Sequence, residues 1–396
     1  MRLSSPPGEV HTDPLPRDAR RRFLRLRGLR LDRPPRWTAA RLVSLALSAV
    51  VHAATAAILA CGVLIVVDWH GNVLGWLFGG ALVAIAILTR PRTVRPPDGV
   101  EEVTREQAPT LFEVADRIAG AVGAAPPAAI YLHDRLFRCA HLRTGVWARV
   151  RRRPVLLVGL PLLLTLTPRE RAGMLGAELA RDVSGDPGRG LLVPAALATT
   201  GEWRHALMGM RVDRYRDFGD PLLDGHSAVP GGRMASQAIG KVTGWVLVWP
   251  LLLAELALRR LVSAQSQHAV YYADQVAARA VSSRAVVEYV DALTTAESRL
   301  TPVMAAARRG ETAEEIRRAV LSRDPDPGLV AARREASLAG QAAWQAEPPT
   351  ALRAVLLESA GVDDGAVGLG SGESDRIDAE LSRHLGRAVR ELSRIT

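Results

Sequence analysis

The chain has few cysteines, few aromatic residues and almost no lysine. Its 396 residues include two cysteines and one lysine, Lys241, and aromatic residues make up 5% of the sequence. Cys61 and Cys139 lie far apart, which predicts free thiols and argues against a disulfide framework or a cysteine-type metal site. With so few aromatics, Ala, Leu and Val must build most of the core, a composition that favours helices.

Arginine therefore carries nearly all of the positive charge, which leaves a formal net charge of +10. Basic and aromatic residues are not interleaved as they are in nucleic-acid-binding surfaces, so we predict no nucleic-acid partner. Many of the arginines instead precede a long apolar run: Arg17, Arg20, Arg21, Arg22, Arg25, Arg27, Arg30, Arg33, Arg36 and Arg41. We expect residues 1–41 to form a basic, disordered tail on the cytoplasmic side of a membrane.

Two uncharged runs follow the tail, Leu42 to Val67 and Val73 to Leu88, separated by a short polar turn. The first is longer than the roughly 20 residues that cross a bilayer core and too long for a cleaved signal peptide. Together they predict a transmembrane helical hairpin over residues 42–89. Arg90, Arg92 and Arg95 follow it, so the positive-inside rule places both flanks in the cytoplasm. The predicted location is a bacterial-type inner membrane, with the bilayer itself as one partner.

A third apolar stretch, residues 242–258, is ambiguous. Lys241 precedes it, Pro250 lies inside it and Glu255 lies near its end. Its charge-free part suits an additional membrane-embedded helix, alone or as a shallow hairpin with Leu191 to Thr200, as well as packing in a soluble domain. The sequence leaves these alternatives open.

The remaining residues predict a main domain over 97–360, followed by a Gly-rich loop and a C-terminal amphipathic helix over 361–396. Ala128 to Leu132 and Pro154 to Gly159 are short strand candidates that could pair as a small sheet. Most of the other segments have helical periodicity, as in Pro109 to Gly123.

One helix has a well-marked start, because Thr167-Pro168-Arg169-Glu170 is a capping box with proline at the first helical position. The helix is expected to run to about Val183, and it contains Ala177-Glu178-Leu179-Ala180-Arg181. In the zinc-peptidase motif H-E-x-x-H, two histidines one turn apart bind zinc and the glutamate deprotonates a water molecule. The present segment keeps the glutamate, but Ala177 and Arg181 stand at the ligand positions.

Three further segments extend this similarity. Asp186 stands five residues after Arg181, Asp274 follows Val270 by four residues on a later helix, and Glu347-Pro348-Pro349 precedes a helix that contains Arg353. In this order the chain resembles the HtpX-like membrane zinc metallopeptidases, relatives of the CAAX prenyl endopeptidases. The resemblance spans roughly residues 40 to 360. It implies a mostly α fold: a transmembrane hairpin, then a metallopeptidase-like helical domain with a small β-sheet.

The resemblance also implies a zinc site, but the chain departs from the family at all three ligand positions. Ala177 and Val270 have no donor atoms, and Arg181 is always charged. Glu347 replaces the histidine of the late motif. We therefore predict no bound cofactor and a pseudopeptidase in which Glu178 is a relict general base.

The site residues implied by the resemblance are Glu178, Arg181, Asp186, Asp274, Glu347 and Arg353, lining a cleft that could bind a peptide or a protein. Arg181 is expected to pair with Glu178 or Asp274. Two other interpretations remain: an active metalloendopeptidase with non-standard ligands such as His141, His205 or His268, and a membrane-anchored helical scaffold unrelated to proteases.

Overall fold

The computed structural model describes residues 17–35, 37–88, 99–144, 153–190, 192–208, 240–323, 326–339, 347–361 and 363–395. The N-terminal helices are α1 (Arg17–Leu26), α2 (Ala39–Asp68) and α3 (Val73–Leu88). The later helices are α4 (Pro109–Val122), α5 (Leu160–Thr165), α6 (Pro168–Ala180), α7 (Leu192–Met208), α8 (Gly240–Val281), α9 (Ser283–Thr294), α10 (Ala296–Arg308), α11 (Ala313–Leu321), α12 (Pro327–Ala339), α13 (Thr350–Ser359), α14 (Ser371–Glu380) and α15 (Ser382–Ser393). The strands are β1 (Val100–Val103), β2 (Ala129–His133), β3 (Cys139–Thr144) and β4 (Arg153–Gly159).

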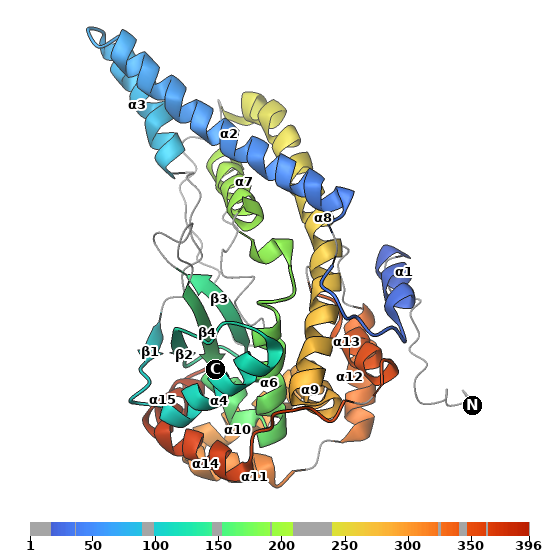
Figure 1. The fold of residues 1–396 in the computed structure, drawn as a ribbon. Helices are drawn as coiled ribbons and strands as arrows, with labels where there is room; N and C mark the ends of the chain where they lie inside the picture. The colour runs from blue at the N-terminus through green and yellow to red at the C-terminus, as the bar shows by residue number, and fades with distance from the viewer. Residues whose placement is uncertain are drawn as a thin grey trace.

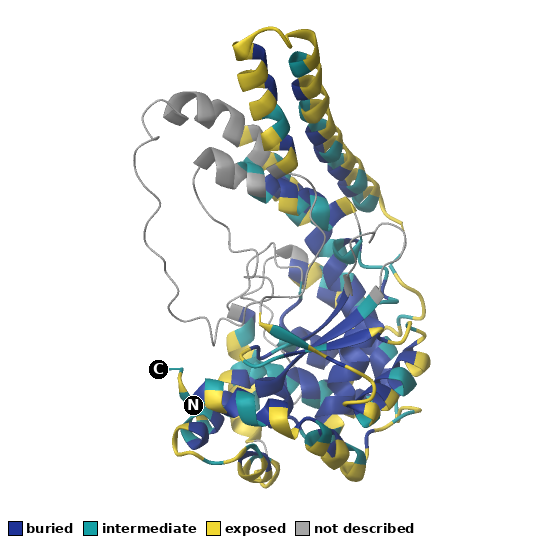
Figure 2. Cartoon of the chain, turned by 90° about the vertical axis from the view of Figure 1, so that its left-hand side faces the viewer, coloured by how far each residue is buried: buried dark blue, intermediate teal, exposed yellow. Residues whose placement is uncertain are grey.

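Helices α2 and α3 form an antiparallel hairpin that projects from one end of the molecule (Figure 1). Most of its large apolar side chains face outward, such as Leu64 at 57% and Phe78 at 64% exposure (Figure 2). In the described part of the chain, α2 is the one helix that is long and apolar enough to cross a membrane, and α3 is a shorter apolar helix. The two predicted apolar runs are therefore helices, and their outer faces are apolar.

The two hairpin helices approach closely at a pair of glycines. A Cβ added to Gly79 would lie 2.7 Å from the Gly62 carbonyl oxygen and 2.6 Å from Val66 Cγ2. A Cβ added to Gly62 would likewise lie 2.9 Å from the Gly79 carbonyl oxygen. Small residues at such a crossing allow the two backbones to approach closely. In a membrane the lipid is as apolar as the helices, so helices associate through this close packing and not through the hydrophobic effect.

The first half of α2 packs against α7 and the apolar part of α8. Val51 of α2, Val193 of α7 and Leu258 of α8 share one buried apolar cluster. The stretch 242–258 is thus not a separate helix, because α8 continues through it for 42 residues without a break. Pro250 lies within this helix.

The sheet is mixed and has the strand order β1-β2-β4-β3. The two predicted strands, β2 and β4, pair in parallel with Leu132 opposite Val158. β1 and β3 pair with them in antiparallel fashion at the two edges. Neither edge strand was predicted, because both are short and flanked by polar residues.

One large apolar core lies between the sheet and the helices of the main domain. It contains side chains of α4, α5, α6, α8, α9 and α10, and it includes Ile377 and Leu381 from the C-terminal segment. The buried Arg171 of α6 also binds Asp378 of α14 at 2.6 Å. Residues 361–396 therefore fold into this core rather than beside it, and the predicted single last helix is two helices, α14 and α15.

The expected disorder of residues 1–41 is wrong for the described residues 17–35. Residues 17–26 form α1, and Phe23 is buried at 1% exposure among side chains of α8, α12 and α13. Composition favoured disorder because arginines dominate the segment. The side chain of Phe23, however, packs in an apolar pocket of the folded domain. A smaller correction concerns α6, which ends at Ala180 rather than near Val183.

We expect Gly79→Leu to destabilise the hairpin, because the new side chain would overlap the backbone of α2. Overpacking of this kind costs about 1–3 kcal/mol. Gly80→Leu is the matched control, since nothing lies within 4 Å of a Cβ at Gly80. Thermal unfolding in mild detergent measures the difference. Equal melting temperatures for the two variants would contradict the close helix crossing.

Candidate functional site

Helix α6 lies at the centre of the site and is buried from Glu170 to its end at Ala180. The predicted capping box is present: the Thr167 hydroxyl accepts from the Glu170 N–H at 3.2 Å, and the Thr167 N–H donates to the Glu170 carboxylate at 2.7 Å. Gly173 lets α9 approach, because a Cβ there would lie 2.1 Å from the Ala285 carbonyl oxygen. This packing fixes Glu178 and Arg181 in the interior, at 3% and 7% exposure.

Arg181 lies between two carboxylates. Its Nη1 donates to Glu347 Oε1 at 2.5 Å, and its Nη2 lies 3.5 Å from Glu178 Oε1. Burial opposes the charge of Arg181, but the two carboxylates outweigh it and raise the pKa of the guanidinium further above its ordinary value. The predicted pairing with Glu178 is therefore present, although Glu347 is the nearer partner.

Glu347 also accepts a hydrogen bond from Arg138 Nη2 at 2.8 Å. Desolvation would raise the pKa of Glu347, but Arg181 and Arg138 overcome it and hold this pKa well below the ordinary value. Glu347 is thus ionised at neutral pH and bridges two guanidinium groups. It joins the turn before α13 to the end of α6.

Glu178 has a less complete set of partners. Its Oε2 lies 3.7 Å from Arg189 Nη2, and it accepts no hydrogen bond from any residue that the structure describes. Burial, and next the like charge of Arg181, lower the pKa of Arg189. A buried carboxylate oxygen in this state is an acceptor for a water molecule or for a donor group of a bound partner.

Asp274 does not pair with Arg181, contrary to one of the two expectations. It forms a bidentate pair with Arg353, with Nε to Oδ2 and Nη2 to Oδ1 both at 2.7 Å. Both side chains are 1% exposed. Burial disfavours the Arg353 cation, but Asp274 outweighs this and raises the pKa of Arg353 above its ordinary value. The pair fastens α13 to α8.

Asp186 lies in the loop after α6 and has a structural role there. Its Oδ1 accepts from Ser266 Oγ at 2.5 Å and from the Gly188 N–H at 2.8 Å. The second bond caps the short 3₁₀ turn Pro187–Arg189. Asp186 therefore ties this loop to α8 and positions Arg189, whose charge it also favours.

The predicted site residues fall into three groups of contacts. Arg181 contacts Glu178 and Glu347, Asp274 pairs with Arg353, and Asp186 binds Ser266 and Gly188. These residues, with Arg138 and Arg189, are here called the charged cluster. Two members, Arg138 and Arg189, were missed by the sequence analysis. Neither belongs to a motif, and arginine is so common in this chain that its type gave no signal.

The residues at the three positions that the resemblance assigns to zinc ligands do not fit zinc. Catalytic zinc needs three nitrogen, oxygen or sulfur ligands and an open position. Ala177 and Val270 offer only buried apolar carbon, at 0% and 3% exposure, and Arg181 offers a cation. Among the described residues no group of three or more His, Cys, Asp or Glu is placed to hold a metal ion.

Two of the histidines named as substitute ligands have described side chains, and they lie on different elements. His141 is buried on β3, with Nδ1 3.8 Å from Asp182 Oδ1. His268 lies on α8, where burial lowers its pKa. The side chain of His205 lies outside the described part of the chain.

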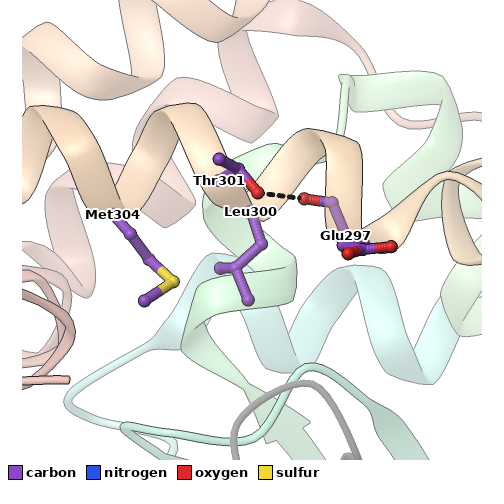
Figure 3. Close-up of a pocket in the computed structure, with 4 residues that line it drawn as sticks. All are labelled: Glu297, Leu300, Thr301 and Met304. Carbon is purple, nitrogen blue, oxygen red and sulfur yellow. Dashed lines mark hydrogen bonds between the residues drawn. The ribbon is translucent and has the colours of Figure 1, made fainter. Parts of the chain in front are cut away.

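A shallow pocket elsewhere does not involve the charged cluster. Glu297, Leu300, Thr301 and Met304, all from α10, line it (Figure 3). The Thr301 hydroxyl donates to the Glu297 carbonyl at 2.8 Å, so it is satisfied within the helix.

No family model, curated protein or solved structure matches this chain.

We expect Arg353→Met to be strongly destabilising, because it leaves Asp274 charged and unpaired in the interior. Breaking a buried pair on one side costs about 3–5 kcal/mol. The double variant Arg353→Met with Asp274→Leu should recover much of the loss, since it removes both charges. Chemical unfolding measures both. A double variant less stable than the single one would show that the interior needs these charges for another reason.

Arg181→Ala should also destabilise the domain, by about 1–3 kcal/mol, because it leaves Glu178 without its nearest cation. Glu347 is 42% exposed, so the part of the cost that comes from Glu347 is reduced by solvent. Arg169→Ala is the control on the same helix, as Arg169 is 51% exposed. Equal melting temperatures for the two variants would count against the role given to Arg181.

Proposed function

We propose that this chain is a multi-pass inner-membrane protein whose cytoplasmic domain is a metallopeptidase-like pseudoenzyme. It acts by binding a peptide, a protein or a membrane partner rather than by cleaving a bond. The observation that carries the proposal is the position of Arg181, whose guanidinium lies between Glu178 and Glu347. In the family that the sequence resembles, this position belongs to a zinc ligand.

The chemistry of the cluster argues against peptide hydrolysis. A peptidase glutamate of this type works on a water molecule whose pKa a metal has lowered. Arg181 supplies positive charge to Glu178, but a guanidinium does not coordinate a water oxygen as a Lewis acid. Glu178 therefore serves as a counter-ion that helps to keep α6 in place.

The outer side of the cluster suits recognition. Arg138, Arg189 and Glu347 each keep part of their side chain exposed, at 33%, 29% and 42%. They present donors and acceptors in fixed directions, because buried residues hold them from behind. A polar segment of a partner could replace the water molecules that hydrate these three side chains.

The membrane part of the proposal rests on the hairpin and its flanks. The outward apolar faces of α2 and α3 are compatible with lipid. At the start of α2 the Arg41 guanidinium lies 4.4 Å from the centre of the Trp37 ring, and Trp37 is 65% exposed. A tryptophan and an arginine at a helix end are typical of a membrane interface. The surrounding arginines favour the cytoplasmic side for this end.

Purified full-length protein should contain far less than one equivalent of zinc and should show no chelator-sensitive peptide cleavage, because three ligand positions lack donors. Metal analysis with a peptidase assay tests this. One bound zinc per chain together with proteolysis that a chelator abolishes would overturn the pseudoenzyme proposal in favour of an enzyme with unusual ligands.

The triple variant Ala177→His, Arg181→His, Val270→Glu tests the alignment of the three positions. It rebuilds two imidazoles one turn apart and a carboxylate on α8, so it should bind roughly one equivalent of zinc. The single variant Arg181→His is the control and should bind much less. If the triple variant folds but binds no more zinc than this control, the three positions do not converge and the resemblance loses its support.

A further inference from the structure

Residues 17–35, here called the N-terminal strap, lie along α8 and α13 next to the charged cluster. In Figure 1 α1 lies at the edge of the molecule beside these two helices. The strap then continues toward the loop after α6, where Pro34 Cβ comes within 3.6 Å of a Cβ placed on Gly185. It thus crosses a surface made of segments remote from it in sequence.

The strap is anchored by one aromatic side chain. Phe23 packs in an apolar pocket with Tyr271 of α8, Leu338 of α12, and Leu352 and Val355 of α13. Beside it, Arg22 Nη2 donates to Gln267 Oε1 at 3.0 Å. The pocket thus accepts an aromatic ring together with an adjacent cationic side chain.

Further along, a glutamine side chain recognises the strap backbone. Gln275 Oε1 accepts from the Leu31 N–H at 2.7 Å, and Gln275 Nε2 donates to the Leu29 carbonyl at 2.9 Å. Both bonds are made to main-chain groups of the strap. They therefore depend on an extended strap backbone and not on which side chains the strap carries. Gln275 is 3% exposed, and both ends of its amide are satisfied by the strap.

The strap makes further polar contacts with the domain: the Gly28 N–H donates to Ser359 Oγ at 3.2 Å, and Arg279 Nη2 donates to the Leu31 carbonyl at 3.4 Å. Arg30 pairs with Asp363 at 2.8 Å, but Arg30 remains 55% exposed. Among strap side chains whose burial is described, Ala19 and Phe23 are buried, while others such as Leu24 and Leu29 are half exposed. Ordering so many residues costs conformational entropy that a few contacts scarcely offset. The strap therefore resembles a bound ligand more than a core element.

The receptor side has the opposite character. Gln267, Tyr271 and Gln275 are buried at 3%, 2% and 3% exposure, on the face of α8 that the strap covers. Without an occupant, the Gln275 amide would lose both partners and the Phe23 pocket would be open to water. An apolar pocket next to a side-chain amide that hydrogen-bonds to main-chain groups is the arrangement found in peptide-binding sites.

We propose that this groove of α8 and α13 is a peptide-binding site and that the strap is its intramolecular ligand. Its ligand class is a short basic helix with one aromatic anchor, followed by an extended segment that offers a free carbonyl and N–H to Gln275. The inference deepens the proposed function, because it places peptide binding in a groove that contains none of the ligand positions Ala177, Arg181 and Val270.

The test uses a fluorescein-labelled synthetic peptide of residues 17–35 and the full-length protein in uncharged detergent. Phe23→Ala in the protein weakens the intramolecular strap and should expose the groove. Fluorescence anisotropy should then show peptide binding at least about tenfold tighter than to the unaltered protein. Absence of binding to the Phe23→Ala protein, or equal binding to both proteins, would overturn the proposal.

Two altered peptides of the same charge serve as controls that leave the protein unchanged. One carries Phe23→Ala, and the other is N-methylated at Leu31 and so lacks the N–H that Gln275 accepts. Each should bind the Phe23→Ala protein much more weakly than the parent peptide does. Equal binding of all three peptides would mean that only electrostatic attraction of the peptide arginines holds them, which would overturn the proposal.

Gln275→Ala, added to the Phe23→Ala protein, should weaken binding of the parent peptide and remove the effect of N-methylation. A thermal unfolding curve shows whether this variant is folded. The outcome is separable from that of the proposed function: cleavage of the bound peptide would refute a pseudoenzyme and leave the groove in place, whereas loss of binding would refute the groove alone.

Discussion

The buried pair of Arg353 and Asp274 is the contact on which the arrangement of the site depends. It joins α13 to α8 in a place where neither charge meets water. An isolated charge in such a place would cost a large part of the stability of a domain, so each residue requires the other. Because Glu347 immediately precedes α13, fixing α13 also delivers this carboxylate to Arg181. The interior therefore tolerates several charges because each is matched across two or more segments.

This matching explains how α6 keeps its polar residues in the interior. Glu178 faces two guanidinium groups, at 3.5 and 3.7 Å. Guanidinium groups differ from a metal because they donate hydrogen bonds in a plane and bind no substrate oxygen as a ligand. They can hold a carboxylate in place, and they can recognise another one. Arg181 thus contributes cohesion between the charged segments.

Local signals in the sequence predicted much of the fold. The capping box at Thr167, the two apolar runs and the helix after Pro349 all appear where periodicity and capping placed them. The candidate site residues were predicted only through the order of motifs. Arg181 lies beside Glu178 as expected, but its closer contact with Glu347 was not predicted, and Asp274 pairs with Arg353 instead. The packing of Phe23 could not be predicted. Its neighbour Arg22 binds Gln267, which lies 245 positions later in the sequence, and no local pattern specifies so distant a partner.

Helix α8 is continuous for 42 residues, about 63 Å, from the apolar bundle to the charged cluster. Because α8 is one unbroken element, a displacement at one end is transmitted along it toward the other. Leu258 lies among the apolar partners of α2, whereas Gln275 and Asp274 lie near the opposite end. A displacement of the apolar end relative to the main domain must either bend α8 or strain the contacts at Gln275 and Asp274. The helix thus provides a mechanical connection between the hairpin and the charged cluster.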